Sequence, residues 1–271
     1  MKHKIEIKRL TAATLPQSDA PLSNKNVYII EKNPFKEQGD VEEVLKIEGR
    51  FDGVLAGEIY PFPSKILVDG RVVDVTSGSN YWVAEKYRKY DFGIGILEDY
   101  FALDQTFILG MVSGQAKPIY EHMGFKVVEF PRYIVLRKVN KILRKHLNAW
   151  LTSVLSLLTN AALLLKELAY SLYVKVKYRQ YTVVEKNIDN INYDAVEQVI
   201  LNSPHKYKEY HNRDWIKFVL NYQANNGGYH KFFEIYRGQE FVGFFMQQVR
   251  NYGESDGWKN FNYGSLIEWG S

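Results

Sequence analysis

The stretch from Arg88 to Gly95, RKYDFGIG, has the residue types of a loop that binds phosphate groups. Such a loop needs free main-chain N–H groups, glycines that let an anion approach closely, and the positive N-terminus of a helix. Gly93 and Gly95 remove side chains where an anion would bind, and the helix expected from Ile96 onward would direct its dipole there. Arg88 and Lys89 add positive charge. The same pattern also fits an ordinary strand-to-helix turn, and the loop alone does not decide between the two.

A second stretch, Ala116 to Phe125 (AKPIYEHMGF), supplies a tyrosine, Tyr120, further along the chain. We expect a short helix here, because Pro118 is tolerated in a first helical turn and Gly124 stands where a C-terminal glycine belongs. The sequence order is therefore strand, glycine-rich turn, helix, strand, and a short helix that carries Tyr120.

Together the two stretches resemble the GNAT N-acetyltransferase superfamily. Members carry a strand that ends in V-x-P-x-Y-R, then a turn of the type Q/R-x-x-G-x-G/A, then a helix. Further along, they carry a strand followed by A-x-x-x-Y-x-x-x-G-F. This sequence matches with Val83-Ala84-Glu85-Lys86-Tyr87-Arg88, Gly93-Ile94-Gly95, and the set Ala116, Tyr120, Gly124 and Phe125. The resemblance covers about residues 27–137.

The resemblance implies an α/β fold of the α+β type, with a mixed, splayed central sheet flanked by helices. Acetyl-CoA would lie in the gap between the central strands, with main-chain groups near Val83 binding the pantetheine arm and helping to polarise the thioester carbonyl. An acceptor amine would attack the thioester directly. Tyr120 matches a tyrosine that can protonate the leaving thiolate, and a phenol with a pKa near ~10 suits that role; the alternative is a packing residue. The pyrophosphate would bind the main-chain amides of Phe92, Gly93, Ile94 and Gly95, with Arg88 and Lys89 nearby.

The sequence departs from the family pattern in two places. The proline after the valine is replaced by Glu85 or Lys86, and the loop between Arg88 and Gly93 is two residues longer than usual. Either the loop is expanded or Tyr90, at the offset of the family's arginine, takes that position without its positive charge.

The residue that deprotonates the amine is not identified. Asp74, Glu58 and Glu85 lie near strand ends, and each reads more readily as a solvated or capping carboxylate. His122 reads as a surface residue, since it faces another side of the helix from Tyr120. The remaining histidines have no metal-ligand spacing, so we expect no metal; they are His3, His146, His205, His211 and His230.

Composition narrows the class of protein. The net charge of +4, from 35 basic and 31 acidic residues, and the lack of a dense basic stripe argue against a nucleic-acid partner and fit an anionic cofactor. The chain has no cysteine, which excludes disulfides and a cysteine nucleophile. The N-terminal residues lack the apolar core of a signal peptide, so we expect a cytoplasmic protein of undetermined oligomeric state.

One apolar segment bears on whether the protein associates with a membrane. Leu147 to Leu165 contains no charged residue and spans 19 positions, close to the ~20 that cross a bilayer. Its two asparagines, two threonines and two serines weaken that interpretation. A buried linker helix is favoured, with association at a membrane surface as the alternative.

Hydrophobic periodicity suggests the remaining elements. We expect strands at 5–10, 27–31 and 44–47, a strand at 53–60 ended by Pro61 and Pro63, a hairpin over 65–75 turning at Asp69-Gly70, and strands at 80–84, 106–112, 125–130 and 132–137. A long helix is expected over 140–175. A new strand at 181–185, helices at 194–202 and 214–222, a hairpin at 232–249 and a strand at 261–269 complete the pattern.

These elements suggest a GNAT-like domain over 1–139, a helical linker over 140–178, and a partial second GNAT-like domain over 179–271. The second copy would end before its own cofactor loop, so it would wall the acceptor site, and the chain would be a fragment or carry a truncated half. The leading hypothesis is an N-acyltransferase that moves an acetyl or other acyl group from acetyl-CoA to an amine of a small molecule, sugar or peptide. Two alternatives stay open: a Fem-like aminoacyl transferase, and a degenerate binding module without catalysis.

Overall fold

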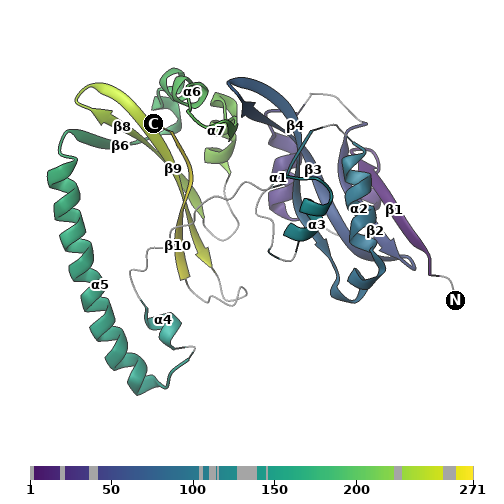
Figure 1. Ribbon diagram of the computed structural model, residues 1–271, viewed down its shortest axis with the longest axis horizontal. Helices are drawn as coiled ribbons and strands as arrows, with labels where there is room; N and C mark the ends of the chain where they lie inside the picture. Colours follow the sequence, from purple (N-terminus) through teal and green to yellow (C-terminus); the bar gives the residue numbers. More distant parts are fainter. Residues whose placement is uncertain are drawn as a thin grey trace. The chain divides into compact units, whose positions relative to one another are not determined.

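The computed structural model describes residues 3–18, 22–36, 42–103, 106–109, 114, 116–126, 139–144, 146–222, 228–252 and 261–270 (Figure 1). The chain divides into two compact units. The first comprises Met1–Val112, Val183–Tyr236 and Phe241–Ser271, and the second comprises Ser113–Thr182 with Arg237–Glu240. The boundaries expected from sequence at 139 and 178 stay a prediction, and each unit is described here by itself.

The first sheet of the first unit is mixed. It contains β1 (Ile5–Thr11), β2 (Val44–Phe51), β3 (Val54–Val68), β4 (Arg71–Val83) and β5 (Phe107–Leu109) in that order, with β7 (Tyr207–Glu209) paired to β3. All pairings are antiparallel except the parallel pairing of β4 with β5. The predicted mixed α/β class is confirmed.

The β3–β4 hairpin forms where the sequence predicts it. Val68 pairs with Arg71, and the two residues between them, Asp69 and Gly70, have φ values of +47° and +76°. Two successive positive φ values match the right-handed twist of the strands, which is why Asp-Gly is a strong hairpin signal.

Two predictions about this sheet are wrong. The segment expected as a strand at 27–31 lies in helix α1 (Asn24–Lys32), whose first turn is capped by the Ser23 side chain accepting a bond from the Asn26 amide. Strand β3 also continues through Pro61 and Pro63 to Val68. Its pairing with β2 ends at Ile59 and its pairing with β7 begins at Ile66, so no described strand pairs with the prolines on that side and a missing N–H is tolerated.

Helix α2 (Phe92–Phe101) covers one face of this sheet (Figure 1). It follows the 3₁₀ turn η2 (Glu85–Tyr90), and its buried residues are Phe92, Ile96, Leu97 and Tyr100. Glycines in the strands let it approach closely: a Cβ atom on Gly49 would lie 2.5 Å from Phe92 Cζ, and one on Gly57 would lie 2.9 Å from Ile96 Cδ1. The helix is therefore fixed against β2 and β3, which positions its N-terminus.

A second, four-stranded sheet has the order β10–β9–β8–β6. Its strands are β6 (Tyr181–Lys186), β8 (Tyr229–Arg237), β9 (Glu240–Tyr252) and β10 (Phe261–Gly270). Helices α6 (Tyr193–Leu201) and α7 (Arg213–Asn221) share a core with it that includes Val196, Ile200, Ile216, Phe232 and Phe244. The elements predicted for this part of the chain are confirmed. The short 3₁₀ helices η1 (Leu15–Gln17) and η3 (Ile188–Asn190) complete the first unit.

The second unit contains α3 (Lys117–His122), α4 (Asn140–Leu143) and α5 (Ala149–Lys177). The expected burial of the long helix is wrong, since Thr152 and Ser156 are the buried residues of α5. The strands expected at 125–130 and 132–137 lie largely outside the described residues, as does the end of the strand expected at 106–112.

Candidate active site

The central strands β4 and β5 pair over a short length. Thr76, Ser77 and Gly78 of β4 pair with Phe107, Ile108 and Leu109, and within the described part of the chain β5 pairs with nothing further along β4. Strand β4 nevertheless continues to Val83. Strand β4 therefore extends beyond the described part of β5, and this end of the strand suits an extended ligand.

A β-bulge in β4 follows Gly78, the last residue that pairs with β5. Ser79 pairs with Tyr60 and Trp82 with Glu58, so that Asn80 and Tyr81 together lie opposite Ile59. Asn80 has a φ of +53°. Bulges redirect side chains and end regular pairing, and they occur often beside active sites. Sequence reasoning missed this feature, and its one signal is an asparagine, a residue that tolerates positive φ, inside a strand pattern.

The turn from β4 into α2 exposes fewer amides than the sequence suggests. Asp91 adopts a φ of +54°, and its carbonyl oxygen accepts bonds from the amides of Ile94 (2.9 Å) and Gly95 (3.3 Å). Those two of the four predicted phosphate-binding amides are therefore already bonded. The amides of Phe92 and Gly93 have no acceptor among the described residues, and α2 has no side-chain cap. A helix N-terminus with two free N–H groups remains available to an anion.

The surroundings of the two glycines of the loop, Gly93 and Gly95, differ. A Cβ atom on Gly93 would lie 2.5 Å from the Tyr81 hydroxyl oxygen and 3.1 Å from Val83 Cγ2, so a larger residue there would have to displace the Tyr81 side chain. Among the described residues, a Cβ atom on Gly95 would have no atom within 4 Å outside the backbone of its own helix. Glycine in a helix costs roughly 0.5–1 kcal/mol relative to alanine, and nothing in the fold explains that cost at Gly95. Space beside Gly95 is therefore open to a ligand.

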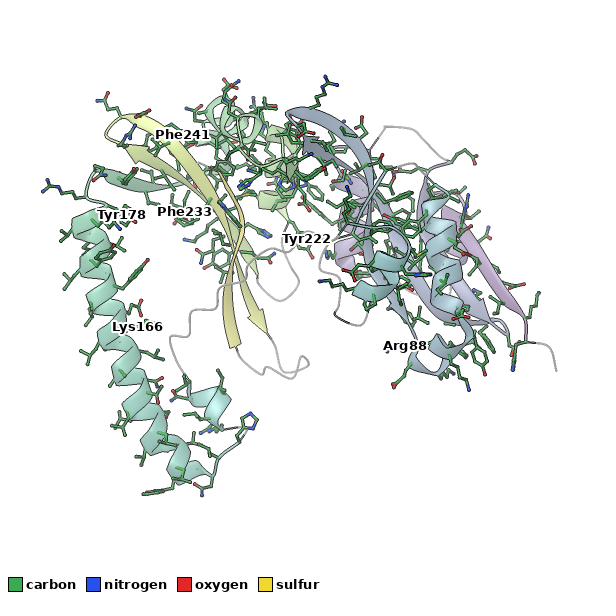
Figure 2. All side chains as sticks on the ribbon, viewed as in Figure 1. Arg88, Lys166, Tyr178, Tyr222, Phe233 and Phe241 are labelled. Atoms are coloured by element: carbon green, nitrogen blue, oxygen red, sulfur yellow. The ribbon has the colours of Figure 1, made fainter. Side chains whose placement is uncertain are left out.

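The two cationic residues of the loop, Arg88 and Lys89, lie in η2, and Figure 2 labels Arg88. Arg88 Nε donates to the Val83 carbonyl oxygen at 3.0 Å, which ties this exposed side chain to the end of β4. Lys89 is exposed, and its Nζ lies 5.0 Å from the centre of the Tyr90 ring. Tyr90 itself packs against Phe51, with ring centres 5.0 Å apart. The lengthened loop therefore begins in the 3₁₀ turn η2, where Arg88 and Lys89 supply positive charge.

Tyr120 lies in α3, in the second unit, so its distance from the loop stays a prediction. The ring is 5% exposed and packs edge-on against Phe125 at 5.9 Å. Burial raises the pKa of the Tyr120 hydroxyl to about 12. This hydroxyl makes no hydrogen bond with the described residues, so its proton is available to an incoming group.

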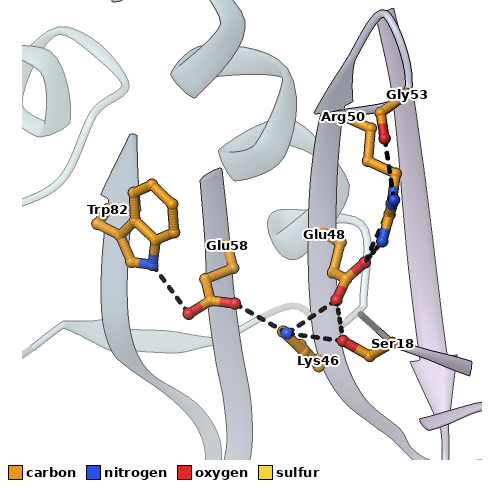
Figure 3. A network of polar contacts seen from close by, with 7 residues as sticks. All are labelled: Ser18, Lys46, Glu48, Arg50, Gly53, Glu58 and Trp82. Atoms are coloured by element: carbon orange, nitrogen blue, oxygen red, sulfur yellow. Dashed lines mark hydrogen bonds and ion pairs between the residues drawn. The ribbon is translucent and has the colours of Figure 1, made fainter. Parts of the chain in front are cut away.

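A buried network of charged side chains spans β2, β3 and β4 (Figure 3). Lys46 Nζ lies 2.8 Å from Glu48 Oε1 and 2.8 Å from Glu58 Oε2, and Arg50 Nη2 lies 3.1 Å from Glu48 Oε2. Ser18 donates to Glu48. Burial raises the pKa of the Glu48 carboxyl, but hydrogen bonds from Lys46 and Ser18 outweigh it, so that its pKa lies below the ordinary value.

Glu58 links this network to the C-terminal end of β4. Its Oε1 accepts a 2.8 Å bond from Trp82 Nε1, next to Val83. The other two carboxylates considered as general bases lie apart from this end: Asp74 lies near the start of β4 and pairs with Lys65, and Glu85 is exposed on η2. Of the three, Glu58 is the one that bonds a residue next to Val83.

A hollow of about 370 Å³ lies between α1 and α7 of the first unit. It is lined by Tyr28, Lys32, Asp214, Phe218 and Asn221. Tyr28 stacks on Phe218 with ring centres 4.9 Å apart and donates its hydroxyl to the Phe218 carbonyl at 2.7 Å. Among the described residues no cluster of His, Asp and Glu could hold a metal ion.

Comparison with known proteins supports the fold. No protein family model and no curated protein matches the sequence. Two solved structures match at a TM-score of 0.50 over 99% of this chain: a GCN5-related N-acetyltransferase from Anabaena variabilis, 9% identical, and a probable N-acyltransferase from Enterococcus faecalis, 11% identical. The chain spans 59% and 58% of their lengths.

The chain therefore has the fold of the GNAT superfamily, as its motifs predicted. The identities are low enough that these neighbours define the fold alone.

Proposed function

We propose that this protein is an N-acyltransferase that uses acetyl-CoA as the acyl donor and an amine as the acceptor. One observation carries the proposal: among the described residues, the helix N-terminus that follows β4 has amides without an acceptor at Phe92 and Gly93 and no neighbouring side chain beside Gly95. Neighbours of the same fold are acyltransferases. A second candidate, the degenerate binding module, would share this geometry and differ in lacking turnover.

The residues divide the work as follows. Main-chain groups of Ser79–Val83 would hold the extended pantetheine arm and polarise the thioester carbonyl. The amides of Phe92 and Gly93, with Arg88 and Lys89, would bind the pyrophosphate. The amine nitrogen attacks the thioester carbon, the C–S bond breaks, Tyr120 would donate its proton to the thiolate sulfur, and the proton that the attacking nitrogen loses would restore the Tyr120 hydroxyl.

The acceptor would enter beside α1 and α7. The hollow there presents the aromatic rings of Tyr28 and Phe218 and the carboxylate of Asp214, which would attract an ammonium group. An amine must lose a proton before it attacks, and Glu58 is the candidate carboxylate that bonds Trp82 at the C-terminal end of β4. We place the protein in the cytoplasm, where acetyl-CoA is available.

Calorimetric titration with acetyl-CoA tests the proposal. We expect saturable binding by the wild-type protein and at least a tenfold loss in Gly95→Ala, whose new methyl group would fill the space next to the pyrophosphate. Gly114→Ala is the matched control, because a Cβ atom there also has no neighbour within 4 Å. No binding by the wild type, or equal binding by Gly95→Ala, would overturn the proposed site.

Release of free thiol in the presence of a panel of amines then separates an enzyme from a binding module. Binding without thiol release supports the degenerate module. Tyr120→Phe should lower the rate of acyl transfer at least tenfold while leaving the dissociation constant for acetyl-CoA unchanged. An unchanged rate would remove Tyr120 from the mechanism.

A further inference from the structure

The buried side chains of α5 are polar, and most of its exposed side chains are apolar. Thr152 and Ser156, four residues apart, are buried, and Asn160, one turn further, bonds the Val139 amide and the Asn140 side chain. The exposed side chains, which we call the apolar surface of α5, are Trp150, Leu151, Val154, Leu155, Leu157, Leu158, Leu164, Leu165, Leu168, Leu172 and Val176. This is the reverse of a helix on a protein surrounded by water.

The exposure on this surface is large. Leu157 is 72% exposed, Leu165 67% and Val176 74%, and side chains project along the whole length of α5, past Lys166 (Figure 2). A helix this apolar is ordinarily a buried core helix or an N-terminal signal. The first does not fit the exposure, and the second does not fit its position at 149–177.

Three hydroxyl groups in the N-terminal half of α5 find partners within the chain. Ser153 Oγ donates to the Ala149 carbonyl at 2.9 Å, and Ser156 Oγ donates to the Ser153 carbonyl at 3.2 Å. Thr152 Oγ1 lies 3.4 Å from the Leu147 carbonyl. Hydroxyl groups that bond to their own helix are compatible with hydrocarbon, where an unpaired polar group is costly.

The residues at and beyond the two ends of α5 are of the types that gather at lipid headgroups. From 141 to 179 the sequence has seven lysines and arginines against one glutamate, and most of them lie at the two ends of the segment. Trp150 lies at one end of α5, and Tyr170, Tyr173 and Tyr178 lie toward the other, where Figure 2 labels Tyr178. Aromatic and basic residues gather at membrane interfaces, and basic clusters favour anionic lipids.

The segment is long enough to cross a bilayer, but the topology opposes crossing. The first unit combines chain from before α5 with chain from after it: β3 pairs with β7, and the Tyr28 hydroxyl bonds the Phe218 carbonyl at 2.7 Å. Both flanks must therefore lie on one side of a membrane. Residues 113–146 contain no uncharged run long enough for a second crossing.

We propose that α5 anchors this protein to an anionic membrane from one side, with its apolar surface in the headgroup and upper acyl region and no crossing of the bilayer. A helix that lies in the interface in this way buries its apolar side among the acyl chains and keeps its basic ends at the headgroups. The proposal does not depend on the acyltransferase function.

Sedimentation with vesicles tests the anchor on the full chain. We expect binding to vesicles of phosphatidylcholine with phosphatidylserine, and binding at least tenfold weaker to phosphatidylcholine alone. Leu157→Glu/Leu165→Glu should abolish binding. Val54→Glu/Val72→Glu, with the same charge change at exposed apolar positions of the first sheet, should leave it intact. Circular dichroism confirms that both variants fold.

No binding by the wild type, or equal binding by Leu157→Glu/Leu165→Glu, would overturn the proposal. So would wild-type self-association without lipid that this variant removes, since a second copy would then cover the apolar surface. Size-exclusion chromatography with light scattering measures that outcome.

The absence of cysteine from the chain allows a topology test. Single cysteines at Val54 and at His205 probe the chain before and after α5, and both should react with a membrane-impermeant maleimide on intact vesicles. Protection of either one would show a crossing and contradict an anchor on one side. A fluorophore on Leu158→Cys should shift to the blue on vesicle binding, and an unchanged spectrum would place α5 outside the lipid.

Discussion

At the scale of single residues, the candidate site depends on why each glycine is present. Gly93 is explained by the Tyr81 hydroxyl against it, whereas the space beside Gly95 is empty. A glycine-rich motif in a sequence does not distinguish a glycine required by the fold from one that leaves room for a ligand. The structure does, and it identifies Gly95 as the position where ligand binding can be tested without disturbing the fold.

Gly93→Ala should destabilise the protein by about 1–3 kcal/mol, the usual cost of forcing an extra methyl group into a packed site. The new Cβ would meet the Tyr81 hydroxyl, so the cost should fall in a Tyr81→Phe background, where that oxygen is absent. Urea unfolding of the four proteins in this double-mutant cycle measures the coupling. Equal costs in both backgrounds would show that Tyr81 is not the obstacle.

The charged network on β2 gives a second prediction for single residues. Lys46→Met removes the cation between the buried carboxylate of Glu48 and the partly buried carboxylate of Glu58, and breaking a buried pair costs about 3–5 kcal/mol. The control is Lys65→Met, since Lys65 pairs with the exposed Asp74 and such pairs contribute about 1 kcal/mol or less. Chemical denaturation compares the two. Similar losses would mean that the network is not stabilised by its central lysine.

At the scale of elements, the length of β3 depends on its pairings with other strands. The sequence predicted most strands and helices because alternating and helical periods are local. It missed the continuation of β3 through Pro61 and Pro63, since tolerance of proline depends on which edge of the strand is open. It also missed the pairing of β3 with β7, whose partners Ile66 and Glu209 are far apart in the chain.

Lys208→Pro should weaken that pairing, because proline removes a main-chain donor from a strand of three residues. We expect a lower melting temperature and faster hydrogen exchange at the amides of Ile66–Val68. Lys208→Ala keeps the amide and serves as the control. Unchanged exchange in the proline variant would mean that β7 does not protect the edge of β3.

At the scale of the whole molecule, buried tyrosines set the response to alkaline pH. Burial raises the pKa values of Tyr120, Tyr193 and Tyr210 to about 12, and they belong to both compact units. A phenol whose pKa is higher in the folded state stabilises the fold fully below its unfolded value of about 10. That contribution is lost as the pH rises from about 10 to 12.

We therefore expect the urea midpoint to stay flat with respect to these groups up to about pH 10 and to fall above it. Tyrosinate absorbance should show a fraction of the 20 tyrosines titrating only as the protein unfolds. Tyr193→Phe should reduce the slope of stability against pH above pH 10. Titration of all tyrosines near pH 10 without loss of structure would contradict this account.

The sequence by itself determined the GNAT-like order of elements, the Asp69-Gly70 hairpin and the glycine turn before α2, because each depends on neighbours in the chain. Only the tertiary structure decided which amides are free, which glycine leaves open space, and that Lys46 and Glu48 are buried. It also reversed the expectation for α5, whose buried residues are polar. Burial depends on which distant segments pack together, and hydrophobic periodicity shows which residues share a face without showing what covers it.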